Sequence, residues 1–62
     1  SGKSSREIDL TGVLYPEDLL AVVAEGFDSI VVEPLSNNRF LLTGDPDEVH
    51  YVIGEVSLQA GI

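Results

Sequence analysis

The sequence predicts an α+β fold, βαββα: an incomplete or three-stranded ferredoxin-like antiparallel sheet with two helices on one face. The first observation behind this prediction is an internal βα repeat, residues 8–25 and 40–55. The second is that each copy places Leu-Thr-Gly before a proline that two acidic residues follow, the pattern of a strand and then a helix start. Because one βα unit cannot bury its apolar face alone, the two copies are expected to pack together.

The first copy contains a strand and a helix. Residues 6–10 alternate polar and apolar side chains, which predicts a half-buried strand. Pro16 suits the first turn of a helix because its missing N–H would be unbonded there, and the two acidic residues that follow complement the positive end of the helix dipole. We expect this helix to reach about Glu25, with Gly26 as a left-handed cap. Its apolar band is wide, which predicts burial on more than one side.

The second half begins with two apolar runs, residues 30–32 and 39–42, that are expected to form a hairpin. Asn37 and Asn38 tolerate positive φ and favour a tight turn between them. Pro34 indicates that the strand ends there or has an unpaired position.

The second helix is expected to start at Asp45. This residue is predicted to be the cap, with proline in the first turn and Glu48 reaching back in a capping box. Gly61 is the predicted stop. The apolar residues at helical spacing are Val49, Val52, Ile53, Val56 and Ala60.

Size and charge restrict the function. Residues 1–5 are interpreted as a tag or linker and residues 6–62 as one small domain. A chain of 62 residues buries only about 60% of its unfolded surface, so we expect oligomerisation or attachment to a larger chain. The net charge of −8 opposes direct binding of nucleic acid. No apolar run approaches the roughly 20 residues that span a bilayer, so no membrane contact is expected, and the predicted location is cytoplasmic.

No catalytic, metal or cofactor motif is found. His50 is the single histidine and there is no cysteine, so a metal site would have no second nitrogen or sulfur ligand. The paired carboxylates Glu17-Asp18 and Asp47-Glu48 repeat at predicted helix starts, where they compensate the helix dipole. We therefore expect no enzyme activity and no cofactor.

Residues 9–20 carry one family resemblance. The segment Asp-Leu-Thr-Gly-Val-Leu-Tyr-Pro-Glu-Asp-Leu-Leu is similar to the strand-to-helix signature of small sulfur-carrier proteins of the TusA/SirA type, in which a Cys-Pro pair opens the first helix. Tyr15 stands where that family has its sulfur-carrying cysteine, and a hairpin is predicted where the family has its second helix. The resemblance therefore implies no persulfide carriage.

The predicted function depends on an open strand. In a ferredoxin-like sheet the last strand pairs beside the first, and only Ile62 follows Gly61 here, so the first strand is expected to be an unpaired edge. Three explanations remain: the chain continues past Ile62, another copy supplies the pairing, or the fold is a natural three-stranded module that dimerises.

We therefore predict a small acidic protein–protein interaction or self-assembly module without catalytic activity, forming a homodimer or binding a protein partner. The predicted interface residues are Glu7, Ile8, Asp9, Leu10, Tyr51 and Leu58. The alternative is a small-molecule-sensing regulatory domain with a polar pocket near Gly12 and Gly44 at a subunit interface.

Overall fold

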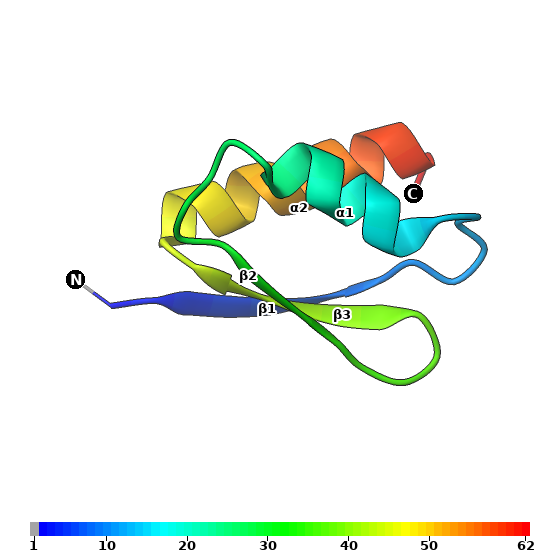
Figure 1. The fold of residues 1–62 in the computed structure, drawn as a ribbon, viewed down its shortest axis with the longest axis horizontal. Helices are drawn as coiled ribbons and strands as arrows, with labels where there is room; N and C mark the ends of the chain where they lie inside the picture. The colour runs from blue at the N-terminus through cyan, green and yellow to red at the C-terminus, as the bar shows by residue number, and fades with distance from the viewer. Residues whose placement is uncertain (1) are drawn as a thin grey trace.

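A computed structural model, described here for residues 2–62, contains the five predicted elements in the predicted order. They are β1 (Ser4–Asp9), α1 (Pro16–Ala24), β2 (Val31–Pro34), β3 (Arg39–Gly44) and α2 (Pro46–Ala60). The sheet is antiparallel with strand order β1-β3-β2, and the two helices lie side by side over one of its faces (Figure 1). The βαββα prediction is therefore confirmed, and both proline-headed blocks are helical.

The hydrophobic core lies between the sheet and the helices. Ile8 of β1 stands opposite Phe40 of β3, and Val32 of β2 stands opposite Leu42, so all three strands turn an apolar row toward the helices. The buried core residues are Ile8, Leu10, Leu20, Phe40, Leu42, Val49, Val52 and Val56. Because β3 pairs on both sides, β1 and β2 are the two edges of the sheet.

The first strand begins earlier than expected. Ser4 and Ser5, which the sequence assigns to a linker, pair with Gly44 and Thr43 of β3. The hydroxyl groups of Ser5 and Thr43 are 2.9 Å apart and share a hydrogen bond. Serine carries no hydrophobic signal, so the alternating pattern stops at residue 6 while the backbone pairing continues to Ser4.

The first helix departs from prediction in two ways. It ends at Ala24 with Glu25 still right-handed, and Gly26 is not in the left-handed conformation, because the chain turns directly so that the Phe27 N–H donates to the Ala24 carbonyl. The wide apolar band is not buried on more than one side. Only Leu20 of α1 is fully buried, and Val22 is 67% exposed.

The start of the second helix uses a different residue from the one expected. Asp45 occupies the cap position but its side chain makes no capping hydrogen bond, and Glu48 does not reach back to it. Instead, the Ser29 hydroxyl accepts a hydrogen bond from the Asp45 N–H at 3.1 Å and donates one to the Glu48 carboxylate at 2.6 Å. Ser29 thus joins the loop before β2 to the start of α2.

Three turn predictions are confirmed. Asn37 and Asn38 have φ of 62° and 60° in the turn between β2 and β3. Pro34 is the last residue of an edge strand. Gly61 ends α2 in the left-handed conformation, and its N–H donates to the Leu58 carbonyl.

Candidate functional site

The backbone of β1 has one side free of hydrogen bonds to the sheet. The Leu10 N–H donates to the Asn38 carbonyl at 2.9 Å, and this contact continues the β1–β3 register. In an antiparallel pair, residues alternate between bonding the partner strand and pointing away from it. The even-numbered residues of β1 therefore face β3, and the backbone N–H and C=O groups of Ser5, Glu7 and Asp9 point away from the sheet. We call these three residues the β1 edge.

The backbone of β2 has fewer N–H groups that point away from the sheet. The Leu35 N–H donates to the Arg39 carbonyl at 2.7 Å, which continues the β2–β3 register. By the same alternation, Val32 and Pro34 are the residues of β2 that point away from the sheet. Proline has no N–H, so Val32 provides the single outward donor of this strand.

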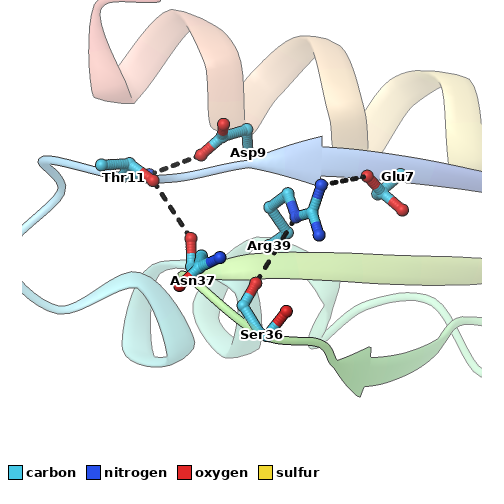
Figure 2. Close-up of polar contacts among 6 residues, drawn as sticks. All are labelled: Glu7, Asp9, Thr11, Ser36, Asn37 and Arg39. Atoms are coloured by element: carbon cyan, nitrogen blue, oxygen red, sulfur yellow. Dashed lines mark hydrogen bonds and ion pairs between the residues drawn. The ribbon is translucent and has the colours of Figure 1, made fainter.

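Charged side chains cross the uncovered face of the sheet beside the β1 edge (Figure 2). The Arg39 Nη1 lies 3.7 Å from the Glu7 Oε1, and the Arg39 Nε donates to the Ser36 carbonyl at 3.4 Å. Both charged groups are about half exposed, so their attraction is screened and contributes little to stability. The contact orients Glu7 along the sheet and leaves its backbone free.

The β1 edge ends at a turn fixed by side chains. The Asp9 Oδ1 accepts a hydrogen bond from the Thr11 N–H at 2.9 Å, and the Thr11 hydroxyl donates to the Asn37 carbonyl at 3.1 Å (Figure 2). Hydrogen bonds from Thr11, and then the Arg39 charge, hold the pKa of Asp9 below its usual value, since both favour the ionised carboxyl group. The next backbone donor after the edge is therefore already satisfied inside the chain.

The predicted interface residues do not form one surface. Glu7 and Asp9 are exposed on the β1 edge, but the side chains of Ile8 and Leu10 are buried in the core. Ile8 and Leu10 cannot supply side-chain contacts to a partner, because the strand alternation turns them toward the helices. Ser5, an exposed part of the edge, is missing from the prediction, since serine gives no apolar signal.

Tyr51 and Leu58 lie on α2, away from the sheet edge. Tyr51 is 53% exposed, and its ring centroid is 5.4 Å from that of Phe27. Leu58 follows two helical turns later and is 75% exposed. We call Tyr51 and Leu58 the exposed apolar residues of α2, and they are separate from the β1 edge.

The predicted pocket beside Gly44 has no space within the chain. A Cβ at Gly44 would come within 3.0 Å of the Ser29 hydroxyl and of the Ile30 Cδ1, so both side chains already fill that position. Beside Gly12, which has φ of 93°, a Cβ would meet no atom within 4 Å. Two hollows lie elsewhere, one between α1 and β2 and a larger one beside it at the start of α1.

Residues 2–62 hold no group of three His, Asp or Glu side chains placed to bind a metal ion. Neither described helix has the length and hydropathy to cross a membrane. No protein-family model, curated protein or solved structure matches the chain. The functional interpretation of the β1 edge therefore comes from its geometry and its charges.

Proposed function

We propose that this domain is a non-catalytic self-assembly module that forms a homodimer through the β1 edge. The observation that carries the proposal is the run of outward backbone donors and acceptors at Ser5, Glu7 and Asp9, which no proline or covering loop within residues 2–62 blocks. Adding a strand there satisfies these groups and extends the sheet. The small core gives such an association a stabilising role.

The charges on and beside β1 favour a second copy as the partner. All three basic residues of the chain, Lys3, Arg6 and Arg39, precede β1, lie in it or lie on its neighbouring strand. Glu7 and Asp9 lie in the same strand. In a two-fold dimer the two copies of this segment run in opposite directions. The positive charges of one copy can then lie opposite the negative charges of the other, so the surface is complementary to itself.

Electrostatics also selects the register of the pair. When two copies of β1 pair antiparallel, hydrogen bonds form only where the outward-facing residues of one strand lie opposite the outward-facing residues of the other. An axis at Arg6 or at Glu7 places two like charges directly opposite, which is unfavourable. An axis at Ser5 places Lys3 opposite the partner's Glu7 and brings no like charges together. Of these three registers the charges favour the axis at Ser5, which is the one we assign.

Single-cysteine variants test this register. Residues opposite each other in a hydrogen-bonded antiparallel pair have Cα atoms about 5.5 Å apart, within the range of about 4.4–6.8 Å that a disulfide needs. The chain has no cysteine, so each variant reports one position. We expect Ser5→Cys to cross-link under mild oxidation faster than Arg6→Cys or Glu7→Cys. Faster cross-linking at residue 6 or 7 would overturn the assigned register.

Light scattering with a proline variant tests the edge itself. Glu7→Pro removes an outward N–H that has no partner in the described part of the chain, so it should weaken the dimer much more than it destabilises the fold. Glu7→Ala is the matched control, because it also removes the Arg39 ion pair but keeps the N–H. We expect Glu7→Ala to stay dimeric and Glu7→Pro to become monomeric at tens of micromolar.

Two outcomes would contradict the proposal. One is a monomeric native chain at that concentration. The other is a dimer that survives Glu7→Pro but is lost in Leu58→Ser, which would place the contact on the exposed apolar residues of α2.

A further inference from the structure

An open groove runs between α1 and the β2 side of the sheet. It consists of two hollows with volumes of about 370 and 230 Å³, and both are bordered by Glu17, Pro34 and Phe40, so they are adjacent. Leu20 and Ala21 of α1 line one wall of the smaller hollow, and Val32 lines the other. We call this hollow surface the α1–β2 groove.

One end of the α1–β2 groove combines exposed apolar and acidic side chains. Leu14 and Tyr15, 81% and 67% exposed, border the larger hollow just before α1 begins. Glu17 and Asp18, in the first turn of α1, border the same hollow. A partner that covers this end must therefore bring apolar side chains and positive charge together.

The charge around the groove excludes a second copy as its natural occupant. Residues 10–38, which contain α1 and β2, hold five acidic residues and no lysine or arginine. Two such surfaces repel each other, whereas a cationic partner is attracted to them. This half of the molecule thus has the opposite preference to the β1 edge.

The backbone of β2 makes an added strand a poor occupant, because Pro34 leaves Val32 as its single outward donor. Binding must rely on side chains that enter the hollows, which is how an amphipathic helix docks into a groove, with apolar anchors one turn apart. We infer that the α1–β2 groove binds a cationic amphipathic helix, with apolar side chains over Phe40 and Ala21 and lysine or arginine beside Glu17 and Asp18.

A designed peptide of about 15 residues is the probe, with leucine at positions i, i + 4 and i + 7 and lysine on the other face. One control peptide has glutamate in place of every lysine, and another has serine in place of every leucine. We expect the leucine–lysine peptide to shift the amide resonances of Ala21, Val32 and Phe40 in an NMR titration. Neither control should do so at the same concentration.

Two pairs of protein variants test the site. Ala21→Phe fills the groove from an exposed helix position, and His50→Phe adds the same side chain to an exposed position on α2. We expect the first to weaken peptide binding about tenfold or more and the second to leave it unchanged. Glu17→Gln with Asp18→Asn should weaken it about threefold to tenfold. The charge-matched control pair is Asp47→Asn with Glu55→Gln.

Clear results would overturn the inference. It fails if either control peptide binds as tightly, if the shifted resonances lie on α2 or on the uncovered sheet face, or if Ala21→Phe binds with native affinity. If Ala21→Phe does not fold, the comparison of the two double variants tests the site: the inference fails if Glu17→Gln with Asp18→Asn binds the peptide as tightly as the charge-matched control pair. Repeating the titration with Glu7→Pro separates this site from the proposed dimer, because the groove contains no residue of the β1 edge.

Discussion

The two edges of the sheet border the same central strand but differ in what they offer to another chain. β1 has six residues, with outward N–H groups at Ser5, Glu7 and Asp9, whereas β2 has four residues and a proline at one of its two outward positions. Open edges readily pair with other strands unless proline or short length protects them. The fold thus protects β2 and leaves β1 available.

Charge divides the molecule in the same way. The β1 side holds every lysine and arginine of the chain together with acidic residues, while the α1–β2 side is acidic alone. The first arrangement suits a second copy of the chain, and the second suits a cationic partner. Opposite edges of a domain of 62 residues are therefore expected to select different partners.

The largest expected effect comes from the strand that the two edges share. Leu42→Ala removes a fully buried side chain from β3 and should lower the free energy of unfolding by roughly 2–5 kcal/mol. Leu41→Ala, on the uncovered face of the same strand, should cost clearly less. Denaturant titration measures both, and equal losses would contradict the assignment of the core to the helix side.

A smaller effect is expected at the half-buried connection between the loop before β2 and the start of α2, whereas the side-chain contact from the β1 side to the same helix start, Lys3 Nζ to Asp45 Oδ1 at 3.6 Å, is exposed. Ser29→Ala removes the half-buried hydroxyl that bonds Glu48 and the Asp45 N–H, so the free energy of unfolding should fall by about 1–3 kcal/mol. Ser36→Ala is the control, because only the Ser36 backbone is used in the turn. Equal stability of the two variants would show that the Ser29 bridge contributes little.

The protection of β2 can be removed directly. Pro34→Thr restores an outward N–H to β2 and should lower stability by about 0.4–1 kcal/mol through the freer unfolded chain. More importantly, it should allow association beyond the dimer, because both edges then offer donors. Light scattering checks this, with Val32→Thr as a control that adds a hydroxyl group but no backbone N–H. Unchanged association would mean that Pro34 is not what protects this edge.

The smallest effect concerns the turn that ends the β1 edge. The pKa of Asp9 is lowered in the folded state, so the folded protein binds fewer protons than the unfolded chain in this range. Its stabilising contribution is complete above the ordinary pKa of 3.8 and is lost as pH falls through the folded pKa. The stability difference between the native chain and Asp9→Asn should therefore shrink on acidification. A constant difference in denaturant titrations across that range would contradict the Thr11 contact.

Local sequence patterns predicted the elements well because each depends on neighbouring residues. Pro16 and Pro46 begin helices by their own geometry, and Asn37 and Asn38 form the turn that their φ preference allows. The prediction that Gly26 caps α1 was wrong, because the end of this helix depends on a distant contact. The chain turns so that Phe27 reaches Tyr51 of α2.

The candidate site was less predictable because it depends on contacts between distant segments. Ser29 and Glu48 are 19 positions apart, and no local pattern links them. The open edge was predictable in outline from the element order. Which backbone groups point outward was not, because that requires the register seen at Leu10 and Asn38.

Amide hydrogen exchange along β1, followed over a dilution series, tests the central claim most directly. The amides of Ser5 and Glu7 should exchange slowly at high protein concentration and become fast on dilution, because the assigned register pairs them with a second copy. The amides of Arg6 and Ile8 face β3 and should stay comparatively protected, and that of Val32 should exchange fast throughout. Fast exchange at Ser5 and Glu7 at every concentration would contradict pairing through the β1 edge.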